Sequence, residues 1–369
     1  MGNFASKAGM SEALFKFAGA CLGHKKGGVA MAAVGACAGF GAICGSSLAT
    51  AATMGKVALP ELRRLGYSGA LSTGALAAGG TLGILIPPSV ILIIYSILTE
   101  QNIAKMFLCA FIPGLLAAIG YIIAISIYVR LNQDSGPIKE RVPWLVRISL
   151  FKNIWHIILI FVVMIGGIYL GFFTPTEGAA IGAAGTGIIA ITNKSFNIRS
   201  FVEVIESTAV TTGMIFFVLL GAEFFNSFIA LTQLPNLLTE FSKENNLEPL
   251  IVVACIMILY LLLGCLMDSL AMILLTIPVF FPLVMSLDFG LSPEETAIWF
   301  GILTLVVVEV GLITPPVGLN VFIINKMAKD VPIIETFKGV IPFLLSDIIR
   351  ITLLFLFPSI TLMMLWIFY

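Results

Sequence analysis

Polar side chains interrupt the long apolar runs of this sequence at a few isolated places. One is Gly45-Ser46-Ser47, which lies in a stretch of small residues, and another is Asp268-Ser269. The proline pairs Pro87-Pro88 and Pro315-Pro316 interrupt two further runs, and each pair removes two adjacent amide donors and pushes the preceding residue away from helical geometry. A helix that unwinds there frees carbonyl oxygens, here those of Gly83, Ile86, Gly311 and Thr314. Hard oxygen donors suited to a sodium ion are then available from these carbonyls and from the hydroxyls of Ser46, Ser47, Ser269 and Thr314.

The composition indicates the environment in which these groups lie. Of the 369 residues, 59% are apolar and only 11% are charged, and the mean hydropathy is +1.08. A soluble domain carries about 25% charged residues, so we predict an all-α membrane protein that crosses the bilayer several times. The 20 basic and 20 acidic residues cancel, which excludes the basic surface of a protein that binds nucleic acid.

Neither catalysis nor a resident cofactor is expected. The six cysteines stand singly inside apolar runs, and only His24 and His156 could serve as imidazole ligands. The sequence shows no nucleophile-base pair and no metal-ligand spacing. We therefore predict that the protein is not an enzyme, that it has no cofactor, and that sodium is the only metal ion it binds.

Apolar stretches of about 20 residues are long enough to span a bilayer. The candidates are 104–129, 153–171, 176–192, 208–221, 249–264, 296–310 and 339–367. Segment 131–152 is the only long polar stretch, and it is predicted to be a linker with a short interfacial helix. The positive-inside rule places this linker in the cytoplasm, because five basic residues lie in or beside it: Arg130, Lys139, Arg141, Arg147 and Lys152.

The two halves of the chain share motifs in the same order. Segment Gly83–Ser89 corresponds to Gly311–Val317 at a shift of 228 residues, and Ser46–Ala49 corresponds to Asp268–Ala271 at a shift of 222. Discontinuous helices in corresponding positions of two repeats are typical of the central site of a transporter. We therefore predict two structural repeats, each with a re-entrant helical hairpin followed by an unwound helix.

The repeats have the following predicted boundaries. The first occupies 1–130, with its hairpin at 28–58 and its unwound helix at 69–98. The second occupies 153–369, with its hairpin at 249–284, its unwound helix at 296–326 and a C-terminal helix at 339–367. The first repeat has about 70 fewer residues before its hairpin than the second, which is room for two or so spanning helices. We therefore expect the first repeat to be incomplete at its N-terminus.

An ionisable residue inside the membrane is a functional candidate by default. Asp268, at the predicted tip of the second hairpin, is the strongest candidate. Glu309 lies two residues before the predicted break at Gly311, and it is either a site residue or a structural partner for backbone donors. Glu177 follows Thr174-Pro175-Thr176, a pattern that favours a capping box at the start of a helix.

Four stretches together resemble the large membrane subunit of tripartite ATP-independent periplasmic (TRAP) transporters. They are Gly41–Thr53, Gly79–Ser89, Thr174–Glu177 and Gly311–Asn320, and the similarity extends over essentially the whole chain. The resemblance implies a sodium-driven secondary transporter for organic acids, in which a domain with two re-entrant hairpins moves like an elevator against a scaffold. It also implies two partners, a small four-helix membrane subunit and a soluble periplasmic substrate-binding protein, and a location in the bacterial inner membrane.

The resemblance further implies one sodium ion between each hairpin tip and the unwound helix of the same repeat. The first site would use Gly45, Ser46, Ser47, Gly83 and Ile86. The second would use Asp268, Ser269, Gly311 and Thr314. The candidates for the substrate pocket are Thr50, Pro88, Glu309, Pro316 and Asn320. The chain departs from the family pattern at Cys44, where serine is common, and at Val307, where asparagine is common.

The predicted function is sodium-coupled import of an organic acid that a periplasmic binding protein delivers. One alternative is a stand-alone sodium/dicarboxylate carrier that needs no binding protein. Another is a non-transporting membrane receptor or assembly scaffold, which would show neither sodium binding nor substrate flux. Substrate specificity is expected to reside mostly in the binding protein.

Overall fold

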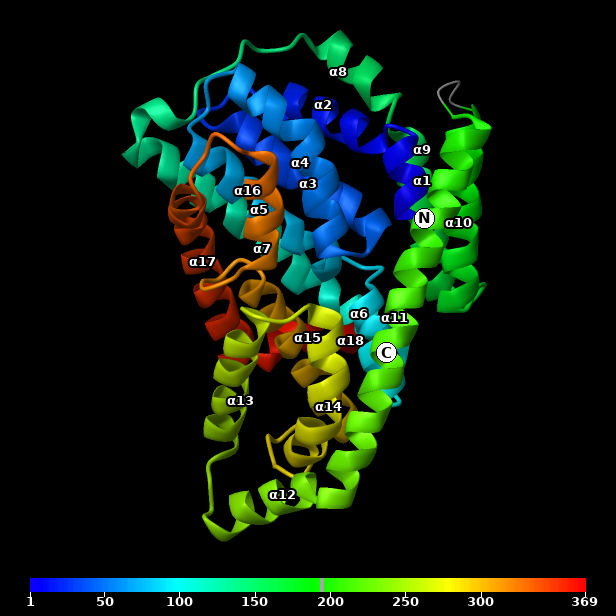
Figure 1. Ribbon diagram of the computed structural model, residues 1–369, viewed down its shortest axis with the longest axis vertical. Coiled ribbons are helices and arrows are strands. Elements are labelled where there is room, and N and C mark those ends of the chain that lie inside the picture. The colour runs from blue at the N-terminus through cyan, green and yellow to red at the C-terminus, as the bar shows by residue number, and fades with distance from the viewer. Residues whose placement is uncertain (193–195) are drawn as a thin grey trace.

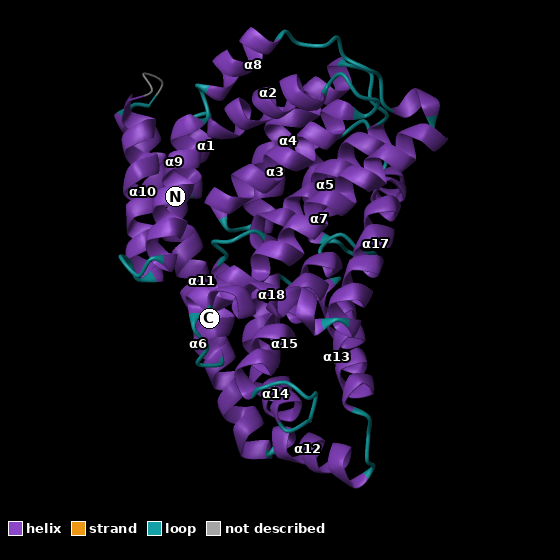
Figure 2. Ribbon diagram, turned by 180° about the vertical axis from the view of Figure 1, so that it is seen from behind, coloured by secondary structure: helices purple, strands orange, loops and turns teal. Residues whose placement is uncertain are grey.

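The computed structural model describes residues 1–192 and 196–369 and is all-helical over them, which confirms the predicted fold class (Figure 2). The helices of the first half are α1 (Gly2–Lys7), α2 (Met10–Leu22), α3 (Gly28–Cys44), α4 (Ser47–Arg64), α5 (Gly69–Leu85), α6 (Val90–Leu98), α7 (Ile103–Leu131), the 3-10 turn η1 (Gln133–Ser135) and α8 (Trp144–Phe151). Those of the second half are α9 (Trp155–Tyr169), α10 (Pro175–Thr192), α11 (Ile198–Thr232), α12 (Leu234–Glu244), α13 (Pro249–Gly264), α14 (Ser269–Met285), α15 (Pro293–Gly311), α16 (Leu319–Met327), α17 (Ile333–Leu356) and α18 (Pro358–Phe368).

Two helices that lie inside the protein, α5 and α15, form its centre. Every residue of α5 from Leu71 to Leu85 is buried, and so is every residue of α15 from Thr296 to Gly311. Because α5 consists largely of Gly, Ala, Ser and Thr, neighbouring backbones can approach it closely. A Cβ added to Gly74 would lie only 2.3 Å from the carbonyl oxygen of Gly339 in α17.

Both central helices end at the proline pairs. Helix α5 ends before Pro87-Pro88, and the next helix, α6, bends away from it by 43°. Helix α15 ends before Pro315-Pro316, and α16 begins only at Leu319. Proline has no backbone N–H to donate, and its ring disfavours helical geometry at the preceding residue, so neither helix continues through its proline pair. Each pair contains a cis peptide bond.

Two pairs of neighbouring helices, α3 with α4 and α13 with α14, have short connections between them. The first connection consists of Gly45 and Ser46, and Gly45 adopts φ = 67°, a left-handed conformation that glycine reaches without steric cost. The second connection covers residues 265–268 and ends at Asp268. We call Gly45–Ser47 tip 1; it is the whole first connection and the first residue of α4. We call Asp268–Ser269 tip 2; it is the last residue of the second connection and the first residue of α14.

Helix α11 runs along one long side of the molecule, and α12 crosses the end of the molecule to reach α13 (Figure 1, Figure 2). Most residues of α11 are exposed, and its 35 residues make it the longest helix of the described chain. It contacts α14 and α12, and Asn226 donates a hydrogen bond of 3.3 Å from its Nδ2 to the carbonyl oxygen of Leu274 in α14. Helix α11 therefore faces the second hairpin.

Three described helices are each long and apolar enough to cross a membrane by themselves: α7, α11 and α17. The number rises to five if each of two bent pairs, α5 with α6 and α8 with α9, counts as one span. Large apolar side chains are exposed along these helices, as lipid contact requires. The chain is thus a multi-pass membrane protein.

The linker between the two halves is fixed to the first half by several backbone contacts. Gly27 donates its N–H to the carbonyl of Gly136 at 3.3 Å, and Ser68 donates to Ser135 at 3.1 Å. The hydroxyl of Tyr67 donates to the carbonyl of Pro137 at 3.0 Å. The short helix α8 follows with Trp144 70% exposed, which suits an interfacial position.

The observed helices differ from the predicted segments in three places. The predicted C-terminal helix 339–367 is two helices, α17 and α18, because Pro358 cannot donate to the helix and disfavours helical geometry at Phe357. The predicted span 208–221 is the middle of a helix that begins at Ile198 and ends at Thr232. The second helix of the predicted hairpin 28–58 continues past Pro60 to Arg64.

Candidate functional site

Tip 1 packs directly against the end of α5. The side chain of Ser46 caps α4 by accepting the N–H of Ala49 at 3.5 Å. A Cβ added to Gly83 would lie 2.7 Å from the carbonyl oxygen of Ser46, and one added to Gly41 would lie 2.5 Å from the Cα of Gly83. Only glycines allow this approach, so the structure brings together Gly45, Ser46, Ser47 and Gly83 from the predicted first sodium site. The side chain of Ile86 lies beside Gly114 of α7, while the predicted contribution of Ile86 is its carbonyl oxygen.

Tip 2 repeats this arrangement at the end of α15. Asp268 caps α14 by accepting the N–H of Leu270 at 3.1 Å. A Cβ added to Gly311 would lie 2.6 Å from the backbone of Gly264, the last residue of α13. The hydroxyl of Thr314 donates to the carbonyl of Val310 at 2.7 Å. The second pair of helices thus lies against its own unwound helix, as the first pair does.

Glu309 connects the two tips. Its side chain is fully buried, in the last turn of α15. The hydroxyl of Ser269 donates to its Oε1 at 2.9 Å, and the hydroxyl of Ser47 donates to its Oε2. These hydroxyls come from the two hairpins, so a single carboxyl group joins elements that lie more than 200 residues apart in the chain.

A pocket of about 290 Å³ opens beside the two tips. Both tips line it, together with α11 and the first residues of the chain, Met1 to Asn3. The lining from α11 includes three threonines with their hydroxyls, Thr208, Thr211 and Thr212. Sequence analysis missed these threonines. The available signal was a row of hydroxyl residues at helical spacing in an apolar helix, Ser207 to Thr212.

None of the five candidates for the substrate pocket lines this pocket, and Glu309 is enclosed behind the tips that it binds. Thr50 and Asn320 are fully buried, and the Thr50 Oγ1 and Asn320 Oδ1 atoms have no hydrogen-bond partner in the described part of the chain. Asn320 donates from its Nδ2 to the carbonyl of Ala77 in α5 at 3.2 Å. Pro88 lines a neighbouring pocket with Gly45, and Pro316 is exposed. None of the four lines the pocket between the tips and α11.

Glu177, as the sequence pattern suggested, has a structural role. The hydroxyl and the N–H of Thr174 both donate to its Oε2 at 2.8 Å, and its own N–H donates to the Thr174 hydroxyl at 3.3 Å. These reciprocal bonds form the predicted capping box at the start of α10.

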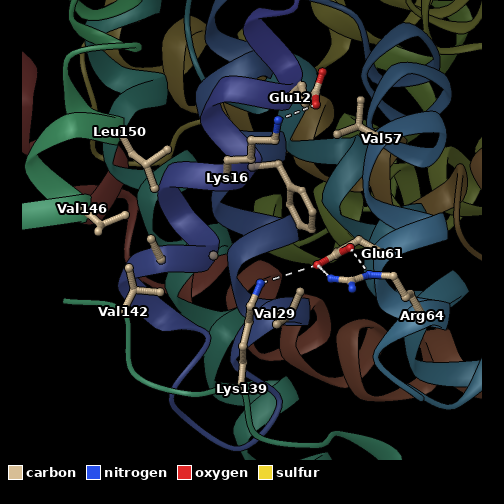
Figure 3. Close-up of a pocket in the computed structure, with 13 residues that line it drawn as sticks. Glu12, Lys16, Val29, Val57, Glu61, Arg64, Lys139, Val142, Val146 and Leu150 are labelled. Atoms are coloured by element: carbon tan, nitrogen blue, oxygen red, sulfur yellow. Dashed lines mark hydrogen bonds and ion pairs between the residues drawn. The ribbon is translucent and has the colours of Figure 1, made fainter.

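Another pocket, of about 460 Å³, lies away from the tips between α2, α4 and the linker (Figure 3). Its charged side chains are paired: Lys16 with Glu12 at 2.7 Å, and Glu61 with both Arg64 at 2.8 Å and Lys139 at 3.5 Å. The hydrogen bonds from Arg64 lower the pKa of the Glu61 carboxyl below its ordinary value. Because every charged side chain in it has an oppositely charged partner, we assign this cluster to the attachment of the linker rather than to substrate.

Comparison with known proteins identifies close sequence relatives. The family model described as "Tripartite ATP-independent periplasmic transporter, DctM component" matches residues 1–360. The C4-dicarboxylate TRAP transporter large permease protein DctM of Pseudomonas aeruginosa is 35% identical over 98% of this chain and 83% of the relative. The sialic acid TRAP transporter large permease protein SiaM of Vibrio cholerae is 29% identical over 98% of this chain and 83% of the relative.

A solved structure supports the fold. The chain aligns with the YdaH transporter of Alcanivorax borkumensis, whose crystal structure is described as having an unusual topology. The TM-score is 0.61 at 14% sequence identity, over 96% of this chain and 83% of the other. At this identity the likeness concerns the fold alone.

Proposed function

This chain belongs to the DctM component family of tripartite ATP-independent periplasmic (TRAP) transporters, and from that membership we propose that it is a sodium-coupled subunit that imports an organic acid by an elevator movement. The observation that carries the proposal is the pocket that both hairpin tips line together. A substrate in this pocket would contact both repeats at once, as in transporters whose sites lie at the interface of two repeats.

The two tips offer oxygen donors for the coupling ions. At tip 1 the carbonyl of Ser46 lies against Gly83, and at tip 2 Asp268 lines the pocket. Sodium held at these positions would place positive charge beside the pocket. An anionic substrate could then bind without an arginine, and no lysine, arginine or histidine side chain lines this pocket.

The moving unit would contain the two hairpins and the central helices α5 and α15. The fixed unit would include α11, which lines the pocket together with both tips. An inward sodium gradient would drive accumulation, and the membrane potential contributes about 2.3 kcal/mol per net charge per 100 mV.

The proposed partners are a small membrane subunit and a periplasmic substrate-binding protein, in the bacterial inner membrane. Relatives are named for C4-dicarboxylates and for sialic acid, so the substrate class we propose is a small organic acid with at least one carboxylate. The linker, with its basic residues, would lie in the cytoplasm.

The test is uptake into proteoliposomes that contain this subunit and its small partner. Candidate acids would be added with and without the binding protein, under an inward sodium gradient. We expect uptake that requires both the binding protein and the sodium gradient. The uptake rate should fall at least tenfold in a variant that carries both Ser47→Ala and Thr314→Ala. Ser286→Ala is the matched control, because its hydroxyl also bonds a helical carbonyl, that of Leu283 at 2.7 Å, but belongs to neither proposed sodium site.

The other outcomes distinguish the alternative functions. Uptake that does not need the binding protein would indicate a stand-alone sodium/dicarboxylate carrier. No uptake of any acid by folded protein, with no stabilisation by sodium, would indicate a receptor or scaffold and would refute the proposal.

A further inference from the structure

Glu309 is placed unusually for a glutamate in this protein. It is 0% exposed, and its neighbours Val308 and Val310 are buried apolar residues. No ion pair involves it in the described residues, since the buried guanidinium of Arg350 is paired with Asp347 at 2.7 Å. A buried carboxyl group without partners is costly, and the hydroxyls of the two tips are the partners that satisfy it.

The two serines that bind Glu309 hold the tips in a fixed relation. Ser47 and Ser269 donate to different oxygens of one carboxyl group, and no hydrogen bond joins the two serines directly. When a hydroxyl donates its hydrogen to Glu309, its lone pairs point away from Glu309 and are available as acceptors. The orientation of each tip hydroxyl therefore depends on the same side chain.

We propose that Glu309 is a positioning residue that couples cation binding at the two tips, through its simultaneous hydrogen bonds with Ser47 and Ser269. This inference rests on the proposed function. A cation at one tip fixes the orientation of the serine hydroxyl at that tip, and this hydroxyl fixes the orientation of the Glu309 carboxyl group. Glu309 then orients the hydroxyl of the other tip so that its lone pairs are available to a second cation. Binding at one tip then strengthens binding at the other, and linkage requires the effect to be reciprocal.

The central test is the sodium dependence of uptake by Glu309→Gln. Glutamine has nearly the same shape but only one acceptor oxygen, so one tip serine loses its acceptor. We expect the Hill coefficient for sodium to fall to about 1 and the half-saturating sodium concentration to rise about tenfold, a typical size for coupling between two sites. The KM for the acid at saturating sodium should change less than twofold.

Thr304→Val is the matched control. Thr304 lies on the same helix and is fully buried, but its hydroxyl has no partner in the described chain and does not touch either tip. We expect it to keep the wild-type Hill coefficient. A Glu309→Gln variant that also keeps that coefficient and the wild-type half-saturating sodium would overturn the inference.

A second measurement covers the case in which Glu309→Gln does not fold. Three variants that keep Glu309 are compared: Ser47→Ala, Ser269→Ala and the double variant with both substitutions. The sodium-induced rise in melting temperature is the readout. If Glu309 couples the tips, the double variant loses less sodium affinity than the product of the two single losses. A double loss equal to that product would overturn the inference.

The outcome also separates this inference from the proposed function. Wild-type protein that takes up an acid with sodium, together with a Glu309→Gln variant of unchanged cooperativity, overturns only the coupling role. Wild-type protein that shows neither sodium-dependent uptake nor stabilisation by sodium overturns the proposed function and the coupling role with it.

Discussion

Replacing Gly83 by alanine tests whether the close contact between tip 1 and α5 maintains the site. The new Cβ would lie 2.5 Å from the Oγ1 of Thr50 and 2.7 Å from the carbonyl oxygen of Ser46. The threonine could change rotamer, but the carbonyl belongs to the backbone, so tip 1 must move away from α5.

The size of the effect follows from two opposing terms. Overpacking of a well-packed interior costs about 1–3 kcal/mol, and alanine in a helix recovers about 0.5–1 kcal/mol relative to glycine. We expect a net destabilisation of up to about 2.5 kcal/mol. Because the shift displaces the carbonyl of Ser46, we also expect the half-saturating sodium concentration to rise by about tenfold, in line with the cost of misplacing a site group by less than 1 Å.

Gly35→Ala is the matched control for this prediction. Gly35 lies in α3 of the same hairpin, but a Cβ there would meet no atom within 4 Å. The assay is the melting temperature in detergent at low and high sodium, followed by uptake. We expect the melting temperature of Gly83→Ala to fall while that of Gly35→Ala stays constant or rises. Equal melting temperatures and equal sodium dependence in the two variants would refute the reasoning.

Three further predictions concern other parts of the chain. Asp347→Ala leaves Arg350 buried without its partner, so it should lower the stability by about 3–5 kcal/mol, seen as a large drop in melting temperature that a surface variant does not cause. The hydrogen bonds from Arg64 lower the folded-state pKa of Glu61, so the ionised Glu61 stabilises the folded protein above the unfolded-state pKa. This stabilisation is lost as the pH falls through the folded-state pKa. The melting temperature should therefore fall in that acidic range, and it should fall less in Glu61→Gln. Thr212→Val removes a hydroxyl from the α11 wall of the pocket, so it should raise the KM for the acid severalfold and leave the half-saturating sodium unchanged; a change in sodium dependence alone would contradict this role.

Local chemistry made much of the fold predictable. The breaks at Pro87-Pro88 and Pro315-Pro316 follow from backbone donors that proline lacks, and the turn at Gly45 follows from a φ that glycine tolerates. The same rule could have located the break before Pro358. The full extent of α11 was less predictable, because Arg199, Glu203 and Glu206 interrupt the apolar pattern at its start without interrupting the helix.

The site was predictable only in part, because its contacts join distant segments. The residue types at tips 1 and 2 indicated oxygen donors, and the structure places both tips at one pocket. The α11 threonines line the same pocket as the tips because α14, which begins at tip 2, packs against α11 (Figure 1). Thr50 and Asn320 look equally polar in the sequence, yet both are buried between helices. Which polar residue faces a cavity depends on helix packing that no local pattern records.

The correspondence between the two halves has a limit that bears on how the site works. At the 228-residue shift, the position that corresponds to Glu309 is Thr81. The Thr81 hydroxyl lies 3.0 Å from that of Tyr121, which donates to Asp347, so this position connects with the buried ion pair and not with a tip. The helices are thus repeated but the polar links are not. One carboxyl group serves both tips, and a second one in its equivalent position would compete for the Tyr121 hydroxyl beside Asp347. Among the described residues, Glu309 alone has a side chain that accepts hydrogen bonds from both tips, so its replacement should affect both tips at once.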